Sequence, residues 1–324
     1  MSDPKSVKVS RDAVVWAYRL FLGREPESEA AIRDHVRGAA DFAALRRAFL
    51  DSAEFSSMSG RRERQGLDGD EPARTIETSG DPAMLRQLFE HIDQTWQHLG
   101  DTDPYWSVLT SAQYRGKPAQ EDIDRFFASG KAEVERLFNY FAREGIRPHP
   151  GVCVEYGCGL GRATRYLADH FERVAGVDIS APHLALAERL ANAAGIGGVD
   201  WTHLESLESL ETLPEADFIY SMIVLQHNPP PVIERIVATF ARILKPGGIA
   251  HFQVPTYRAD YEFRLNDYLK NHVGRKEMEM HVFPQRRIFE IFSDAGAVPV
   301  MVMEDGSTGF RPGERSNTFT FRKT

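Results

Sequence analysis

From Gly151 onward, short segments rich in β-branched residues alternate with amphipathic helical segments. The strands are predicted at residues 152–156, 173–180, 199–203, 216–225 and 247–255. The helices are predicted at residues 162–171, 183–194, 232–244 and 284–295. Strands that alternate with helices in this way form a parallel sheet with crossover helices on its faces. Two further strands, 298–303 and 317–321, flank a Gly-rich region and are predicted to form an antiparallel hairpin.

A glycine-rich loop with the sequence EYGCGLGR follows the first predicted strand and opens the first helix. Its glycines allow a tight turn and let a ligand approach main-chain atoms without an intervening Cβ. The dinucleotide motif G-x-G-x-x-G/A fails in both frames, because its last position is Arg162 or Thr164. No G-K-[ST] follows either, so the loop argues against NAD, FAD and a P-loop nucleotide.

The segment EYGCGLGR resembles the E/D-x-G-x-G-x-G motif of class I S-adenosylmethionine-dependent methyltransferases. Three further segments follow in the order that this family has: GVDIS at the second strand, FIYSMIVLQH at the fourth, and LKPGG before the fifth. The resemblance extends over about 170 residues. It implies an α/β fold with a Rossmann-like seven-stranded sheet, mostly parallel with a C-terminal antiparallel hairpin, and S-adenosylmethionine as the cofactor.

The same resemblance implies which residues would hold the cofactor. Glu155, just ahead of the glycines, suits the methionine ammonium group, and Asp178 would accept hydrogen bonds from the ribose hydroxyls. A helix N-cap is the alternative role for Asp178. Glu205 stands where the family often places an acid near the adenine amino group. The predicted cofactor residues are Glu155, Gly157, Gly159, Gly161, Asp178, Glu205 and Ser221.

The end of the fourth strand and the charge of the chain both argue against nucleic acid as the acceptor. Relatives that methylate amino groups carry N/D-P-P-Y/F there, whereas this chain has SMIV from Ser221. Asn228–Pro230 lies beyond the strand and is interpreted as the start of the next helix. The net charge is −8, and its evenly spread acidic excess leaves no basic block for a nucleic acid.

Two histidines are candidates for a catalytic base. LQHNP resembles the L-x-H-x-P stretch of many methyltransferases that act on small molecules and sugars, which would place His227 where open α/β sheets bind ligands. An imidazole with a pKa near 6.5 is suited to accept a hydroxyl proton. His281, in MEMHVFP, is the second candidate. The alternatives are a structural role for His227 and a polar hinge position for His281; no Asp/Asn cluster marks a metal site.

A long insert, residues 256–283, separates the fifth strand from the last crossover helix. Class I methyltransferases place substrate-recognition caps at this position, so Tyr257 and Tyr261 are predicted to contact the acceptor. Tyr105 and Trp106 lie in an unusually aromatic stretch before the α/β segment. They either form a wall of the binding cleft or pack over the neighbouring domain.

The first 55 residues are predicted to form a separate helical module. The segments AYRLFLGREPES and FAALRRAFLDSAEF resemble a small bacterial helical domain of unknown function that is often attached to enzymes of cell-surface polysaccharide assembly. Residues 56–81 are rich in Ser, Gly and charged residues and are predicted to be a linker. Residues 82–324 are the predicted methyltransferase domain, with a helical lead-in at 82–150 and the α/β core at 151–324.

The remaining expectations concern the compartment and the acceptor. Cys153 and Cys158 are predicted to be buried and unpaired, which suits a reducing compartment, and no signal peptide or membrane span is evident, so a cytoplasmic location is expected. The predicted activity is O-methylation of a sugar or polysaccharide-related hydroxyl on a small-molecule or glycan acceptor, with possible docking through the helical module. The alternatives are O-methylation of a secondary metabolite or peptide carboxylate, and a non-catalytic protein that binds cofactor or glycan.

Overall fold

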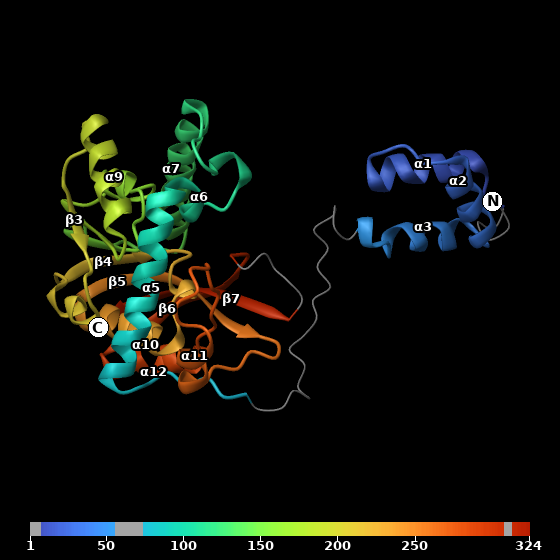
Figure 1. The fold of residues 1–324 in the computed structure, drawn as a ribbon. Helices are drawn as coiled ribbons and strands as arrows, with labels where there is room; N and C mark the ends of the chain where they lie inside the picture. Colours follow the sequence, from blue (N-terminus) through green and yellow to red (C-terminus); the bar gives the residue numbers. More distant parts are fainter. Residues whose placement is uncertain (1–7, 56–73, 308–312) are drawn as a thin grey trace. The chain divides into compact units, whose positions relative to one another are not determined.

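A computed structural model describes residues 8–55, 74–307 and 313–324 of the chain. The chain divides into two compact units, residues 1–68 and residues 69–324 (Figure 1). Within the described residues, no helix is both long enough and apolar enough to cross a membrane.

The N-terminal unit contains three helices, α1 (Arg11–Leu22), α2 (Glu29–Gly38) and α3 (Phe42–Leu50). Ser10, Ser28 and Asp41 cap their N-termini, because each side chain accepts a hydrogen bond from a backbone N–H of the first turn. Gly23 ends α1 in the left-handed conformation, with φ 62°. The helices bury a small core of their own, in which the rings of Tyr18 and Phe49 meet edge to face at 4.9 Å.

The larger unit is built on a seven-stranded sheet with the order β3-β2-β1-β4-β5-β7-β6. Its strands are β1 (Val152–Tyr156), β2 (Arg173–Asp178), β3 (Val199–His203), β4 (Ala216–Ser221), β5 (Leu244–Arg258), β6 (Ala297–Asp305) and β7 (Glu314–Lys323). The first five are parallel, and β7 pairs antiparallel with both β5 and β6. The predicted α/β fold and its C-terminal hairpin are therefore confirmed.

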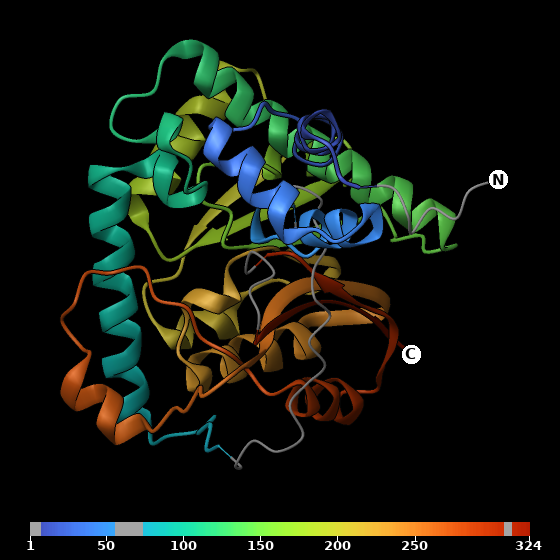
Figure 2. The same cartoon turned by 90° about the vertical axis from the view of Figure 1, so that its right-hand side faces the viewer.

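Helices cover both faces of this sheet (Figure 2). They are α5 (Pro82–Thr102), α6 (Pro104–Val108), α7 (Gln120–Arg143), α8 (Thr164–Leu167), α9 (Ala181–Ala193), α10 (Pro230–Ile243), α11 (Leu265–Asn271) and α12 (Gln285–Asp294). The main core lies between the sheet and α5, α10 and α12, and a second core lies between the sheet and α7 and α8. Cys153 and Cys158 are buried and are not disulfide-bonded, as predicted.

Two boundaries differ from the prediction in ways that shape the site. β4 ends at Ser221 and not at Leu225, because Ile223 has a φ of 61° that turns the chain. The short helix η4 (Leu225–His227) follows, so His227 is the last residue of a single helical turn beyond the strand. β5 extends to Arg258 and so includes the first residues of the predicted cap.

Residues 74–81, the C-terminal part of the predicted linker, pack against the cap insert. Ile76 forms a β-bridge with Phe263, and the Glu77 carboxylate accepts a hydrogen bond from the backbone N–H of Leu265 at 2.6 Å. Arg74 forms an ion pair with Asp260 on the same insert. This stretch therefore belongs to the larger unit; the rest of the predicted linker, residues 56–73, lies outside the described residues.

Candidate active site

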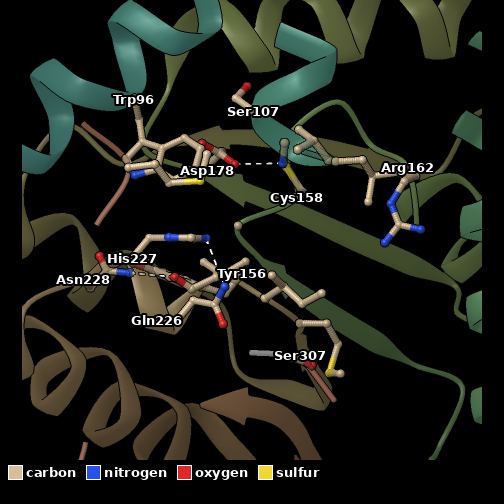
Figure 3. Close-up of a pocket in the computed structure, with 18 of the residues that line it drawn as sticks. Trp96, Ser107, Tyr156, Cys158, Arg162, Asp178, Gln226, His227, Asn228 and Ser307 are labelled. Carbon is tan, nitrogen blue, oxygen red and sulfur yellow. Dashed lines mark hydrogen bonds between the residues drawn. The ribbon is translucent and has the colours of Figure 1, made fainter. Parts of the chain in front are cut away.

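A cavity of about 640 Å³ lies at the carboxyl ends of β1, β2 and β4 (Figure 3). Its walls come from the loop after β1, from the helices α5 to α7, from the loop after β4 and from the cap insert. Open α/β sheets bind ligands at this edge, and the volume lies in the range of small-molecule sites.

The glycine loop forms the floor of the cavity on the side of β1. Gly157 and Gly159 line it and have φ values of 76° and 53°, which L side chains rarely adopt. A Cβ on Gly159 would lie only 2.8 Å from Cγ2 of Val108 on α6. Gly161 faces the ring of Trp201 and not the cavity, since a Cβ there would lie 2.6 Å from that ring. Gly161 therefore serves packing within the domain, and the other two glycines shape the cavity.

Asp178, at the end of β2, joins the glycine loop to the next helix. Its Oδ2 accepts a hydrogen bond from the Gly159 N–H at 2.8 Å, and its Oδ1 accepts one from the Ser180 N–H at 2.9 Å. Ser180 is the N-cap residue of α9, so Asp178 is not. Each carboxylate oxygen keeps a further lone pair, and Asp178 lines the cavity, so its side chain is available to ligand hydroxyl groups.

Glu155 is a buried carboxylate at the far end of the cavity. Its Oε2 has no hydrogen-bond partner among the described residues, and burial raises its pKa to about 8. An unpaired buried acceptor of this kind favours a cationic ligand group, because such a group would offset the cost of desolvating the carboxylate.

A second charged group lies beside Glu155 and was not predicted from the sequence. Arg162 forms a 2.6 Å ion pair with Glu133 of α7, and the Tyr220 hydroxyl donates to the same carboxylate at 2.5 Å. All three side chains line the cavity. Together with Glu155, this end of the cavity offers both an acidic and a basic group, which fits the zwitterionic amino-acid portion of S-adenosylmethionine.

Besides Gly161, two further predicted cofactor residues do not line the cavity. The Glu205 side chain is 83% exposed and lies 3.9 Å from His203. Ser221 is buried, and its Oγ donates to the Tyr156 carbonyl at 2.9 Å, which ties β4 to β1. In their place, the cavity is lined by His183, whose ring nitrogens lie 2.8 Å from Ser107 Oγ and 2.7 Å from Ser180 Oγ.

His227 lies on the opposite side of the cavity from Asp178 (Figure 3). Its Nδ1 lies 2.8 Å from the Glu279 carbonyl oxygen, so Nδ1 carries the proton and donates it to that oxygen. Nε2 therefore holds a lone pair, which accepts a 3.3 Å hydrogen bond from the amide N–H of Gln226. Burial lowers the pKa of His227 to about 4, although the bond to the Glu279 carbonyl opposes this shift. The imidazole is thus neutral near pH 7 and able to accept a proton.

His281 is buried but does not line this cavity. Its Nε2 lies 2.9 Å from Glu279 Oε2, and its Nδ1 lies 2.9 Å from the Tyr261 hydroxyl. The neighbouring Met278 and Met280 line the cavity instead. The structure therefore places one of the two predicted catalytic histidines at the cavity and the other behind its wall.

The four aromatic residues predicted to contact substrate also lie outside the lining. Tyr105 packs edge to face on Phe126 at 5.2 Å, which is the packing alternative that the sequence left open. Trp106 lies under the Arg115 guanidinium, 4.0 Å from its carbon. Tyr261 contacts His281, and Tyr257 lies in β5 opposite Arg315. Tyr105, Trp106 and Tyr261 are therefore held by side chains of their own domain.

The side of the cavity around His227 is lined by both apolar and polar residues, and the aromatic side chain found there is Trp96 of α5. Its ring meets that of His227 edge to face at 5.4 Å. A polar pair stands at the ends of β5 and β7, where Arg258 lies 3.4 Å from Glu314. The apolar lining residues on this side are Ile92, Trp96, Met222, Ile223, Val224, Met278 and Met280.

Comparison with known proteins gives the class of this domain. Residues 153–248 match the family described as a methyltransferase domain. An S-adenosyl-L-methionine-dependent Diels-Alderase from Talaromyces variabilis is 40% identical over 180 residues, which are 54% of this chain and 54% of that protein. A ubiquinone biosynthesis O-methyltransferase from Methylococcus capsulatus is 32% identical over 128 residues, 38% of this chain and 53% of that protein. The chain spans about half the length of the curated relatives it matches.

Among solved structures, magnesium protoporphyrin IX methyltransferase from Synechocystis, with bound S-adenosylhomocysteine, aligns with a TM-score of 0.48 and 17% identity. That alignment covers 73% of this chain and all of the other. On its strand order, the α/β core has the Rossmann-like methyltransferase fold, and residues 153–248 within it match a methyltransferase domain. Its cofactor is S-adenosylmethionine.

Proposed function

We propose that this protein transfers a methyl group from S-adenosylmethionine to a hydroxyl oxygen of a small-molecule acceptor. The observation that supports this most directly is the neutral His227, whose Nε2 lone pair borders the cavity while Nδ1 is held by the Glu279 carbonyl. A hydroxyl needs such an acceptor as it becomes a nucleophile, whereas an amine does not need a base to the same degree.

The cofactor would occupy the half of the cavity next to β1 and β2. Glu155 would hold its ammonium group, Arg162 its carboxylate, and Asp178 its ribose hydroxyls. Bound there, S-adenosylmethionine supplies an electrophilic methyl group on a sulfonium centre. Gly157 and Gly159 leave the space that this approach requires, since neither carries a Cβ.

The remaining steps belong to the side chains of the acceptor half. Trp96 and the methionine side chains exclude water and hold the acceptor hydroxyl in line with the methyl group, and this alignment would supply most of the acceleration. His227 takes the hydroxyl proton at Nε2, and the Glu279 carbonyl stabilises the imidazolium that forms. A positioned general base raises the reaction rate by about 10²–10⁴-fold.

The chemistry of the lining favours an acceptor with an apolar body. Methionine side chains adapt their shape to irregular apolar groups, and three of them, Met222, Met278 and Met280, line the acceptor half. A sugar hydroxyl remains a second proposal, carried by the resemblance of the N-terminal helices to a domain of polysaccharide enzymes. The four aromatic residues predicted as acceptor contacts do not line the cavity and so give this second proposal no support.

The test is methyl transfer from labelled S-adenosylmethionine to a panel of phenols, alicyclic alcohols, nucleotide sugars and amines. Transfer to a phenol or apolar alcohol supports the proposal as stated, and transfer to a nucleotide sugar supports the sugar acceptor. Transfer to amines alone would contradict both. Comparing full-length protein with a form lacking residues 1–68, on free and carrier-bound acceptors, tests whether the helical unit docks the acceptor.

A second function is favoured by the relative described as an S-adenosyl-L-methionine-dependent Diels-Alderase. In that case the apolar half of the cavity would fold a conjugated substrate so that two carbon–carbon bonds form, with no group transferred and no proton removed. The cofactor would be bound but not consumed. Conversion of a polyene substrate without formation of S-adenosylhomocysteine, and without loss of activity in His227→Gln, would favour this function over methyl transfer.

A further inference from the structure

The segment Met278–His281, here called the strap, separates the cavity from a buried polar cluster. Met278 and Met280 line the cavity, whereas the side chains of Glu279 and His281 lie on the other side of the strap. One stretch of four residues therefore forms part of the cavity wall with Met278 and Met280 and carries the polar cluster with Glu279 and His281.

The Glu279 carboxylate is the centre of that cluster. The Tyr268 hydroxyl of α11 donates to it, and His281 Nε2 lies 2.9 Å away. His91 of α5 lies behind them: its Nδ1 accepts a bond from the Gly274 N–H at 3.2 Å, so its Nε2–H is directed to Glu279 at 4.0 Å. Burial of the carboxylate raises the pKa of Glu279, but the hydrogen bonds from His281 and Tyr268 lower it by more. The pKa of Glu279 is therefore held below its usual value.

The groups that face Glu279 thus come from three elements. His91 belongs to α5, Tyr268 to α11, and His281 to the strap itself. Behind them, Tyr261 bonds to His281, and His272 stacks on the Tyr268 ring at 5.2 Å. Because the donors come from separate segments, the carboxylate fixes where the strap runs relative to both helices.

The backbone of the strap contacts the loop that carries His227 at two points. The Glu279 carbonyl accepts the His227 Nδ1–H at 2.8 Å, and the His281 N–H donates to the Gln226 carbonyl at 2.7 Å. A neutral imidazole can carry its proton on either nitrogen, and its hydrogen-bond partner decides which. The position of this one carbonyl therefore selects the form of His227 that keeps its lone pair on Nε2, where it accepts only the long, 3.3 Å hydrogen bond from the Gln226 amide.

We propose that Glu279 is a positioning residue: its carboxylate anchors the strap so that its own carbonyl fixes the tautomer of His227 and Met278 and Met280 close the acceptor wall. The catalytic part of this inference rests on the proposed methyl transfer with His227 as base. The tautomer itself does not depend on that function, so it provides an independent readout.

Imidazole nitrogen NMR on ¹⁵N-histidine-labelled protein reports the tautomer and the pKa directly, with His227→Gln identifying the signals of His227. The wild type is expected to show one tautomer, protonated at Nδ1, that titrates near pH 4. In Glu279→Ala, the strap loses its anchor, so the signals should show mixed tautomers and a midpoint moved upward as water reaches the ring. A Glu279→Ala protein with the wild-type tautomer and titration would overturn the proposal.

Two further variants separate positioning from general damage. Glu279→Gln keeps an oxygen that can accept from both Tyr268 and His281, so it should retain the tautomer. The exposed Glu277→Gln serves as the matched control and should leave it unchanged. If Glu279→Ala does not fold, Tyr268→Phe removes a single donor and should give a partial shift, and an unaltered tautomer in that variant would again overturn the proposal.

Kinetics connects the tautomer to the reaction. Methyl transfer by Glu279→Ala should fall about 10–100-fold in kcat, with the acid limb of kcat/KM moved upward from near pH 4, while Glu279→Gln stays within about threefold. If the NMR changes appear but no variant, wild type included, transfers methyl groups to the panel, the proposed function fails and the positioning role stands. Normal kinetics with an altered tautomer would mean that His227 is not the base.

Discussion

The two halves of the cavity are assembled in different ways. The cofactor half takes Glu155, Gly157 and Gly159 from one turn of the chain and Asp178 from the next strand along. The acceptor half collects residues from α5, from the loop after β4, from the strap and from the ends of β5 and β7. Residues of one β-strand and the turn after it supply the glycines and Glu155 of the first half, and Glu133 of α7 and Tyr220 of β4 complete it, whereas every part of the second half comes from a different distant segment.

If the halves are functionally separate, His227→Gln should remove activity and leave cofactor binding intact. We expect kcat to fall about 10²–10⁴-fold, because the acceptor hydroxyl loses its base, while the Kd for S-adenosylhomocysteine stays within about twofold. His98→Gln, an exposed change on α5, is the control and should affect neither quantity. A large loss of cofactor affinity in His227→Gln would show that the two halves are not separate.

Asp178→Ala should instead act mainly on cofactor binding. The change removes the ligand contacts and also leaves the buried N–H groups of Gly159 and Ser180 without their acceptor. The unsatisfied donors should lower stability, by about 1–3 kcal/mol each. Each lost hydrogen bond between the carboxylate and a ligand hydroxyl is worth about 1.5–3 kcal/mol, so we expect the affinity for S-adenosylhomocysteine to fall about 100-fold or more by calorimetry. Asp200→Ala, which removes a surface ion pair with Arg173, is the matched control. Wild-type affinity in Asp178→Ala would mean that the cofactor lies elsewhere.

This contrast also explains what the sequence could predict. Glu155 and Asp178 could be predicted as site residues, because Glu155 is part of the glycine motif and Asp178 ends the next predicted strand. Trp96 was not, since it continues the same helical stripe as the core residues Leu88 and Ile92 and nothing in the sequence separates it from them. His281 points away from the cavity because side chains of the strap alternate between its two sides. Which residues face the cavity is set by the hydrogen bond between the His281 N–H and the Gln226 carbonyl, a contact between distant segments that no local sequence pattern encodes.

Gly159→Ala tests how closely α6 packs on the cofactor loop. The new Cβ would meet Val108 at 2.8 Å and would also oppose a φ of 53°. Gly195→Ala is a matched control, because Gly195 has a φ of 69° but open space around its Cβ position. Both variants should lose about 1–2 kcal/mol of stability for the backbone conformation. Only Gly159→Ala should also lower the affinity for S-adenosylhomocysteine, by about tenfold. Equal affinities in the two variants would argue against a close approach of the ligand to this loop.

The smallest expected effect concerns the proton on Glu155. Burial raises the pKa of this carboxyl to about 8 from 4.5, so the folded protein without cofactor binds a proton more readily than the unfolded chain. The stabilising contribution is therefore complete below about pH 4.5 and is lost as the pH rises toward 8. Glu155→Gln should flatten this part of the curve of stability against pH, measured by chemical unfolding.

Cofactor binding should lower the pKa of Glu155, because an ammonium group beside the carboxylate favours its charged form. Binding of S-adenosylhomocysteine near pH 7 should then release up to about one proton, measured by calorimetry in buffers of different ionisation enthalpy. Glu155→Gln should bind without this release, and Glu205→Gln, at the exposed acid outside the cavity, should release the proton as the wild type does. Proton release that persists in Glu155→Gln would place the ammonium group beside another acid and would move the cofactor half of the site.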